Sequence, residues 1–471
     1  MTGKTVAMKV TSLAGQVVLA WLLLEEDFGL YALALTVYGV GSLVHQAGVR
    51  EVLIHRQASF ERWATAGFWL SLTLGTAAAS LIVGLAPIAA RIYDEPGLTP
   101  LLWILALGIP LKSLEVVPRT LLQNQLRFAP LALVGLVSNI LEVLGAITLA
   151  FLGFGALSFV IPKPIVYLMQ SGVTWGLARP HLRRGFEFRK WRHLVDHSVL
   201  SLVAAFLAMA IMQGDYILLG LLFPAQMVGI YYFAYRLSSQ TLSVFNANMA
   251  QVLLPALSKY TSDPSRQIAG FLSGLKTMAL ITVPVCLLQA ALAEPVVGIL
   301  FEERWAEAIP LIQILSVGMA FHAVGGNTGS TLLRAQGRFS TLVWVLCVRA
   351  TVFFLAVGIG AHLGGLEGAA FGVLAFMVST GAFGFTVAVL PGGGDWLSFW
   401  RVILPPLLLG AFAVGASVIL ANSIPEAFSS NALSMIIIVV TSGSLYLLGA
   451  AALLRSHCDE FRRRLEQVWK H

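Results

Sequence analysis

The sequence predicts an all-α integral membrane protein with about 14 transmembrane helices, and three observations support this fold class. Of the 471 residues, 58% are hydrophobic and 11% are charged, whereas soluble domains carry about 25% charged residues. Long apolar runs follow one another along most of the chain, and the first half of the pattern recurs in the second half. A soluble globular protein is therefore excluded, and so is a disordered chain, which would be poor in apolar residues.

A helix needs about 20 mostly apolar residues to cross the hydrocarbon layer of a bilayer. Windows of that length give candidate spans near residues 5–24, 28–46, 66–90, 98–120, 130–151, 154–176, 198–222, 226–250, 270–292, 308–330, 340–361, 366–389, 402–421 and 432–453. Several neighbours are separated by only a few residues, so we expect antiparallel hairpins. The first run lacks a small-residue cleavage site after Leu24, which favours a retained helix over a signal peptide.

The loops between these spans alternate in charge. If the N-terminus is cytoplasmic, that side carries 22 Lys and Arg, whereas the other side carries two, Arg91 and Arg304, together with 11 acidic residues. Cytoplasmic loops are the ones enriched in Lys and Arg. Both termini are therefore predicted to be cytoplasmic, and most of the net charge of +7 reflects topology and not a nucleic-acid partner.

The two halves of the chain repeat each other. Gly29–Tyr31 recurs as Gly229–Tyr231, and Gln125–Phe128 recurs as Gln336–Phe339, at offsets of 200 and 211 residues. Each repeat holds six spans, an even number, so both enter the membrane in the same direction. We expect two parallel six-helix lobes with a cleft between them, and a C-terminal helix pair outside the repeat.

This organisation divides the chain into five predicted parts. They are an N-terminal lobe at 1–178, a basic cytoplasmic linker at 179–197, a C-terminal lobe at 198–390, spans 13 and 14 at 391–454, and a basic cytoplasmic tail at 455–471. The linker is interpreted as a positive segment lying on anionic lipid, with Phe188 and Trp191 at the interface. A dedicated partner-binding loop is the alternative.

Nine ionisable residues fall within the predicted spans, where charge is costly unless it is paired or hydrated. They are the cations Lys9, Lys112, Lys163, Arg236, Lys276 and Arg349 and the acids Glu115, Glu142 and Asp215. Three of the cations, Lys9, Arg236 and Lys276, lie near cytoplasmic helix ends, where long side chains can reach the interface. The spacing of Lys112 and Glu115 allows a pair on one helix face. A structural pair of Glu142 with Lys163 is also open, and Arg349 and Asp215 lie deep in their spans.

Several motifs together resemble bacterial polysaccharide exporters. They are Gly214–Gly220, Gly229–Tyr231, Tyr235–Leu237, Gln251–Ser258 and Ala293–Pro295, with Leu121–Gln123 and Arg127–Phe128 earlier in the chain. The chain is similar, over roughly residues 5–390, to the polysaccharide-transporter (O-antigen flippase-like) family of the multidrug/oligosaccharidyl-lipid/polysaccharide exporter superfamily. The resemblance implies a fold like that of the multidrug and toxic-compound extrusion (MATE) transporters.

The resemblance also implies a function: translocation of undecaprenyl-diphosphate-linked oligosaccharide repeat units across the bacterial inner membrane. A polysaccharide polymerase and a chain-length regulator are the implied protein partners. A small-molecule antiporter and a membrane-embedded polymerase are the alternatives. No G-x-x-x-x-G-K-[ST] motif or hydrolase motif is present, so we expect a secondary transporter rather than an enzyme, with no cofactor. The three cysteines form no CxxC pair, and no metal site is expected.

A lipid diphosphate needs positive groups to replace the water that it loses in the membrane, and Arg and Lys supply them. The candidate substrate-binding residues are therefore Arg349, Lys112, Lys163, Lys276, Arg236 and Lys9. Coupling to protons or sodium ions would need a titrating acid, and the candidates are Asp215, Glu142 and Glu115.

Two further patterns lie in the second half. Gly360, Gly364, Gly368 and Gly372 recur every four residues, which favours close helix packing over a hinge. His322 lies in the middle of its span beside Gly325 and Gly326. It is interpreted as an interior histidine with satisfied hydrogen bonds, and a broken helix that lets substrate approach is the alternative.

Overall fold

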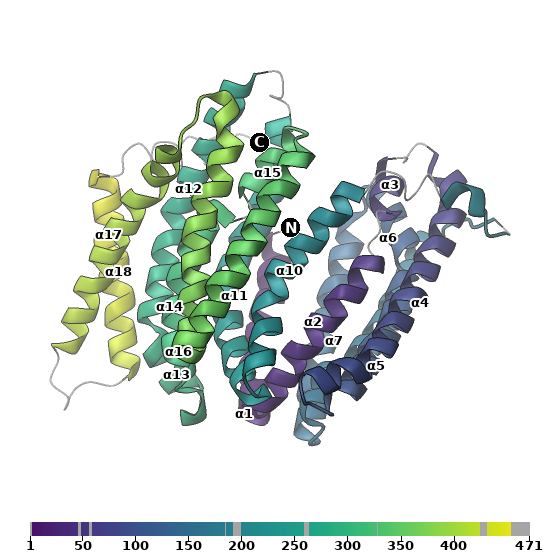
Figure 1. The fold of residues 1–471 in the computed structure, drawn as a ribbon, viewed down its shortest axis with the longest axis horizontal. Coiled ribbons are helices and arrows are strands. Elements are labelled where there is room, and N and C mark those ends of the chain that lie inside the picture. The colour runs from purple at the N-terminus through teal and green to yellow at the C-terminus, as the bar shows by residue number, and fades with distance from the viewer. Residues whose placement is uncertain are drawn as a thin grey trace. The chain divides into compact units, whose positions relative to one another are not determined.

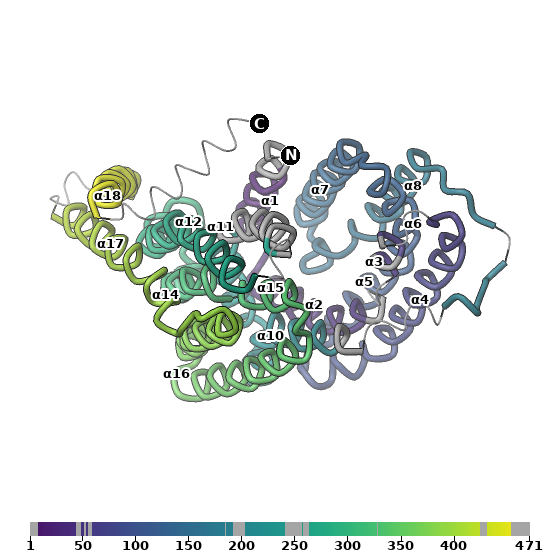
Figure 2. Tube along the Cα trace, turned by 90° about the horizontal axis from the view of Figure 1, so that it is seen from above, coloured from purple at the N-terminus to yellow at the C-terminus, as the bar shows by residue number. Residues whose placement is uncertain are grey.

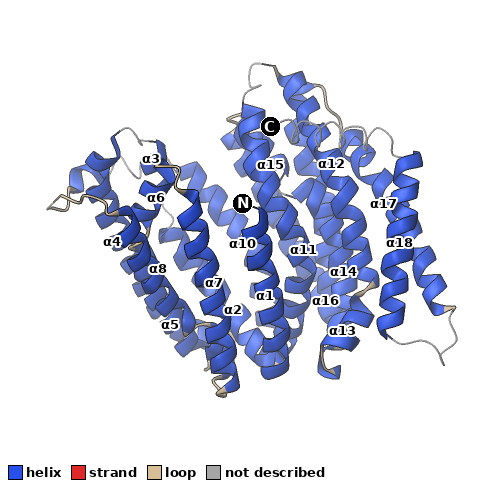
Figure 3. Ribbon diagram, turned by 180° about the vertical axis from the view of Figure 1, so that it is seen from behind, coloured by secondary structure: helices blue, strands red, loops and turns tan. Residues whose placement is uncertain are grey.

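The computed structural model describes residues 2–45, 49–55, 59–183, 185–191, 199–258, 263–326, 328–423 and 431–453. In this part of the chain every regular element is a helix, and no strand occurs (Figure 3). The all-α prediction is therefore confirmed. The predicted tail at 455–471 and residues 184 and 192–197 of the predicted linker lie outside the described residues.

Backbone contacts group the chain into two compact units, Met1–Tyr232 (unit 1) and Phe233–His471 (unit 2). Unit 1 contains α1 (Thr2–Leu22), α2 (Glu25–His45), α3 (Val49–His55), α4 (Phe60–Ile92), α5 (Leu98–Ser113), α6 (Val116–Asn124), α7 (Phe128–Phe151), η2 (Gly155–Phe159), α8 (Pro162–Ala178), η3 (Phe188–Lys190) and α10 (Val199–Leu222), and the start of α11 (Ala225–Ser258) (Figure 1). Helix α10 packs on α2 within this unit. The predicted lobe limits near residues 178 and 198 stay a prediction.

Unit 2 contains the remainder of α11 and the elements that follow it. They are α12 (Pro264–Ala291), α13 (Ala293–Leu300), η4 (Glu303–Trp305), α14 (Ala308–Phe321), the π-helical turn η5 (His322–Gly326), α15 (Thr328–Ala335), α16 (Phe339–Val389), η6 (Leu390–Gly392), α17 (Trp396–Asn422) and α18 (Asn431–Leu453). The predicted C-terminal pair corresponds to α17 and α18, which pack on each other, and both also contact α12.

Nine of the described helices are long and apolar enough to cross a membrane, and the bent pair α5 and α6 would make a tenth. These helices make the chain a multi-pass membrane protein. The predicted number of about 14 spans stays a prediction, because α1 contributes only the shorter apolar helix Met8–Leu22 and α2 is not among the nine.

Helix α16 is counted once among those nine, yet it has two legs. Gly364 and Gly365 leave helical geometry, with φ −141° and φ 60° respectively. A Cβ atom on Gly360 would overlap the carbonyl oxygen of Gly368, and one on Gly372 would overlap that of Ala356. The legs therefore fold back on each other, which matches the predicted spans 340–361 and 366–389. Close packing is therefore the role of Gly360, Gly368 and Gly372, whereas Gly364 meets no neighbouring atom and lies at the break between the legs.

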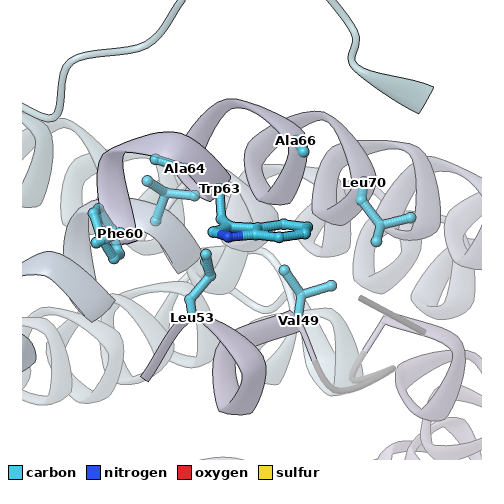
Figure 4. Close-up of a cluster of buried hydrophobic side chains, with 8 residues drawn as sticks. Val49, Leu53, Phe60, Trp63, Ala64, Ala66 and Leu70 are labelled. Carbon is cyan, nitrogen blue, oxygen red and sulfur yellow. The ribbon is translucent and has the colours of Figure 1, made fainter. Parts of the chain in front are cut away.

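In unit 1, α4 packs beside α2 and α5, and α8 packs beside α5 and α7. Figure 2 shows these helices from above. Where α3 meets α4, buried apolar side chains form a cluster around Trp63, together with Leu53, Phe60 and Leu70 (Figure 4). The partly buried Leu182 and Trp191 pack against the same cluster. This contact fixes the segment after α8 to the start of α4.

The repeat-related glycines of α2 and α11 make reciprocal contacts. A Cβ atom on Gly29 would overlap the carbonyl oxygen of Ala225, and one on Gly229 would overlap the carbonyl oxygen of Glu25. Glu25 and Ala225 are themselves 200 residues apart, like the two glycines. Only glycine permits two helix backbones to approach this closely. The sequence repeat is therefore matched by a pair of equivalent contacts.

Candidate functional site

A cavity of about 470 Å³ lies inside unit 1, on the side where α5 bends into α6. Its lining comes from α2, α3, α4, α5 and α6: Tyr38, Ser42, Val49, Arg50, Ser71, Ile109, Lys112, Glu115, Val116 and Arg119. The bend of 43° between α5 and α6 interrupts the predicted span at 98–120. Because the helix breaks there, charged side chains from both pieces reach the same cavity.

The cavity carries three cations and one carboxylate. Glu115 is buried and accepts a hydrogen bond from Arg119 Nη1 at 2.8 Å. The carboxylate therefore pairs with Arg119. The spacing had instead allowed a pair with Lys112, and this pair does not form. The Lys112 ammonium lies 5.3 Å from the ring centre of Tyr167, and Arg50 donates from Nε to Gln123 Oε1 at 3.3 Å. Among the described residues, neither Lys112 nor Arg50 forms an ion pair.

Two of these cations were not candidates from the sequence. Arg50 lies between two predicted spans and Arg119 lies at the very end of the predicted span 98–120, so neither is among the nine intramembrane candidates. The structure places them on the short helices α3 and α6, which line the cavity. Only the interrupted helix at 98–120, with Pro110 and Pro118 inside it, hinted at such an arrangement.

Lys163 and Glu142 form an ion pair between α8 and α7. This pairing is one of the two alternatives that the sequence left open. The Lys163 ammonium also lies 5.8 Å from the ring centre of Tyr31. Both charges are therefore neutralised inside unit 1, and neither is among the residues that line the cavity.

Asp215 is buried in α10 with 2% of its surface exposed. Its Oδ2 accepts a hydrogen bond from the Tyr231 hydroxyl at 3.1 Å, and its Oδ1 accepts one from the Tyr216 backbone N–H at 3.0 Å. Within the described part of the chain no cation pairs with it. Of the three candidate acids, Asp215 alone combines deep burial with the lack of a described positive partner.

Arg349 is enclosed in unit 2, with 4% of its surface exposed. Its Nη1 donates to the carbonyl oxygen of Gly326 at 2.6 Å, and its guanidinium carbon lies 5.6 Å from the ring centre of Phe376. The bond ends the π-helical turn His322–Gly326, where one extra residue per turn breaks the regular hydrogen bonding. Among the described residues, Arg349 Nε and His322 Nδ1 have no hydrogen-bond partner.

This geometry bears on two expectations. The span at 308–330 is interrupted by the π-helical turn, as the broken-helix alternative proposed. The His322 Nδ1 atom, on the other hand, is not satisfied by the described residues. Arg349 does not line the cavity of unit 1.

The remaining candidate cations lie apart from that cavity. Arg236 of α11 is exposed, and Lys9 of α1 and Lys276 of α12 are half-buried. None of the three lines the cavity of unit 1.

A second cavity, of about 440 Å³, lies in unit 2 between α12, α17 and α18. Its lining is almost entirely apolar: Leu280, Ile281, Pro284, Val285, Leu288, Gly410, Ala413, Val414, Ser442, Gly443, Tyr446, Leu447, Ala450 and Ala451. The hydroxyl of Tyr446 donates to the carbonyl oxygen of Leu280 at 2.8 Å and so does not point a free donor into the space. The sequence indicated the helix pair but gave no sign of this groove.

The fold of this chain is similar to that of a solved lipid flippase and of a solved transporter of the multidrug and toxic-compound extrusion type. A solved structure of the lipid II flippase MurJ in an inward closed conformation aligns with a TM-score of 0.75 and 14% identity, over 96% of this chain and 98% of that one. An inward-facing MATE-family multidrug resistance transporter aligns with a TM-score of 0.59 and 15% identity, over 85% of this chain and 95% of that one.

Within this class, the family model described as "Polysaccharide biosynthesis protein" matches residues 18–310, and the chain belongs to that family. The teichuronic acid biosynthesis protein TuaB of Bacillus subtilis (strain 168) is 24% identical over 411 residues, which is 86% of this chain and 83% of TuaB. The lipopolysaccharide biosynthesis protein WzxC of Escherichia coli (strain K12) is 23% identical over 433 residues, or 87% and 85% of the two chains. The succinoglycan biosynthesis transport protein ExoT of Rhizobium meliloti (strain 1021) is 25% identical over 349 residues, or 74% and 70%.

Proposed function

We propose that this protein is an inner-membrane flippase that translocates undecaprenyl-diphosphate-linked oligosaccharide repeat units for the synthesis of a cell-surface polysaccharide. The relatives named for teichuronic acid, succinoglycan and lipopolysaccharide synthesis support the pathway class. The observation that carries the proposal is the cationic cavity of unit 1, lined by Arg50, Lys112 and Arg119 around one carboxylate.

The chemistry of this cavity fits a diphosphate. Phosphate oxygens bind guanidinium groups through paired hydrogen bonds and ammonium groups as point charges. With Glu115 paired to Arg119, the charges of Lys112 and Arg50 remain available for an anionic ligand. Hydroxyls of Tyr38, Ser42 and Ser71 lie in the same lining and can bond to sugar hydroxyls. A neutral or cationic drug would gain nothing from this excess of positive charge.

The apolar groove of unit 2 supports a lipid substrate. An isoprenoid chain offers only apolar surface, and the groove between α12, α17 and α18 offers almost no polar atoms to it. Binding there would hold the chain next to the transporter while its head group crosses. The two cavities thus match the two chemical halves of a lipid-linked sugar.

We propose alternating access as the mechanism, with Asp215 as the coupling site. Glu115 and Glu142 each have a cationic partner, Arg119 and Lys163. Asp215 instead has hydroxyl and backbone N–H donors. A carboxylate of this kind can bind a proton or a sodium ion without displacing a cation.

The other candidate residues receive secondary roles in this proposal. Arg349 holds the π-helical turn of unit 2, and the pair of Lys163 with Glu142 joins α8 to α7. Lys9, Arg236 and Lys276 remain candidates at the ends of their helices. Cytoplasmic termini, and a polysaccharide polymerase and a chain-length regulator as partners, complete the proposal.

A deletion strain distinguishes this function from its alternatives. Loss of a flippase leaves complete lipid-linked repeat units on the cytoplasmic leaflet, which an impermeant sugar-oxidising reagent detects in oriented vesicles. Repeat units accumulating on the outer leaflet would instead identify a polymerase. Unchanged polysaccharide with altered sensitivity to drugs would identify a small-molecule antiporter. Either of these outcomes contradicts the proposal.

A further inference from the structure

The segment that follows α8 is held against α4 by specific bonds. Arg179 ends α8 in the left-handed conformation, with φ 47°, and turns the chain. The Arg183 backbone N–H then donates to Thr65 Oγ1 at 2.8 Å, and Lys190 Nζ donates to the carbonyl oxygen of Arg62 at 2.7 Å. Together with the packing of Leu182 and Trp191 on the Trp63 cluster, these bonds fix the segment at the start of α4.

Trp69 of α4 and three aromatic rings of this segment form a continuous row. The ring centres of Trp69 and Phe186 are 4.4 Å apart, those of Phe186 and Phe188 are 5.5 Å apart, and those of Phe188 and Trp191 are 4.7 Å apart. Phe186 and Phe188 are nevertheless 49% and 63% exposed. The bonds to α4 thus hold the segment in a position that leaves these two large apolar rings exposed.

From the length of α4 we expect the row near the membrane surface. Helix α4 has 33 residues and is about 50 Å long, whereas about 20 residues suffice to cross the hydrocarbon. Its ends therefore project into the headgroup layers, and Trp69, nine residues after Phe60, lies near the hydrocarbon boundary. Phe186 contacts Trp69 and so lies at the same depth.

The charges around the row select a partner. Arg179, which ends α8, and Arg183 and Arg189 of the segment have exposed side chains. The one acidic residue among them, Glu187, is paired with Lys190 at 2.8 Å. Exposed arginines next to aromatic rings at the headgroup level match the phosphates of anionic phospholipids.

We propose that residues 182–183 and 185–191 form a binding surface for anionic phospholipid of the adjoining leaflet. The rings of Phe186 and Phe188 insert at the boundary between headgroups and acyl chains, and Arg183 and Arg189 bind phosphates. This surface concerns the membrane around the protein and is independent of the proposed transport substrate.

The test uses the full-length protein with an environment-sensitive NBD probe at Phe188→Cys and the native cysteines replaced. It is reconstituted in phosphatidylcholine vesicles with or without 30% phosphatidylglycerol. We expect a blue-shifted, several-fold brighter probe in the anionic vesicles. Arg183→Gln with Arg189→Gln should abolish the difference between the two lipids. The matched control, Arg266→Gln with Arg401→Gln, removes two exposed cations elsewhere and should preserve the difference.

Hydrogen exchange of the unmodified protein gives a second measurement that needs no substitution. Backbone amides of residues 185–191 should exchange more slowly in nanodiscs with phosphatidylglycerol than in nanodiscs without it. A probe that stays in a polar environment in both lipids would overturn the proposal. Equal burial in both lipids would overturn the recognition of anionic headgroups.

Discussion

The charged side chains inside the helices of this protein differ in their neighbours more than in their residue type. Lys163 lies against a carboxylate, whereas Lys112 lies against an aromatic ring at the wall of a cavity. An ion pair neutralises both partners and leaves little charge for a ligand. Lys112 therefore keeps more of its charge for an anionic ligand than Lys163 does.

The contacts of Arg349 predict the effect of removing it. Arg349→Ala leaves the carbonyl oxygen of Gly326 without its donor in a buried π-helical turn, which costs about 1–3 kcal/mol. We expect lower polysaccharide export and a lower Tm, with the protein still present in the membrane fraction. Arg401→Ala, which removes an exposed arginine of the same unit, should change neither. Normal export by Arg349→Ala would refute the role of this side chain.

The environment of Asp215 predicts how transport is coupled. Asp215→Asn keeps the size of the side chain and one of the two oxygens that accept bonds from Tyr216 and Tyr231, but it has no carboxylate to take up a proton or a sodium ion. We expect the flux in reconstituted vesicles to fall and to lose its response to proton and sodium ionophores. Asp395→Asn is the matched control, because Asp395 is the N-cap of α17 and an Asn side chain can also accept the bond from the Ser398 N–H. If the flux through the Asp215→Asn variant responds to ionophores as the flux through the natural protein does, Asp215 is not the coupling site.

At the scale of elements, broken helices set the site more than regular ones do. The bend between α5 and α6 brings Lys112 and Arg119 to one cavity, and the π-helical turn exposes a carbonyl oxygen to Arg349. Hydrophobic periods predicted the helices and the fold of α16 at Gly364, because both depend on local residue patterns. The cavity cations Arg50 and Arg119 could not be predicted, because helix bending depends on packing far along the chain.

The reciprocal glycine contacts give a prediction at the same scale. Gly229→Ala places a methyl group against the carbonyl oxygen of Glu25, and overpacking of this kind costs about 1–3 kcal/mol. We expect a lower Tm and reduced export. Gly172→Ala in α8 is the control, since its added methyl meets no atom within 4 Å. Equal Tm values for the two variants would contradict the close crossing of α2 and α11.

At the scale of the whole molecule, the two units carry different chemistry. The cavity of unit 1 is lined by cations and hydroxyls, and the groove of unit 2 is apolar. The internal repeat and the alternating loop charges predicted a transporter of two related halves, because both patterns can be read directly from the sequence. The division of polar and apolar binding surfaces was not predictable, because it depends on which side chains each bundle turns inward.

The most direct test of the account is the initial rate at which purified protein moves an undecaprenyl-diphosphate-linked oligosaccharide between the leaflets of a vesicle. Removing a charge-assisted contact to phosphate costs about 1.5–3 kcal/mol, so Lys112→Ala should slow this movement about 10- to 100-fold. Arg266→Ala, which removes an exposed cation outside both cavities, should leave the rate unchanged. A Lys112→Ala protein as fast as the natural one would contradict the claim that the unit 1 cavity binds the diphosphate.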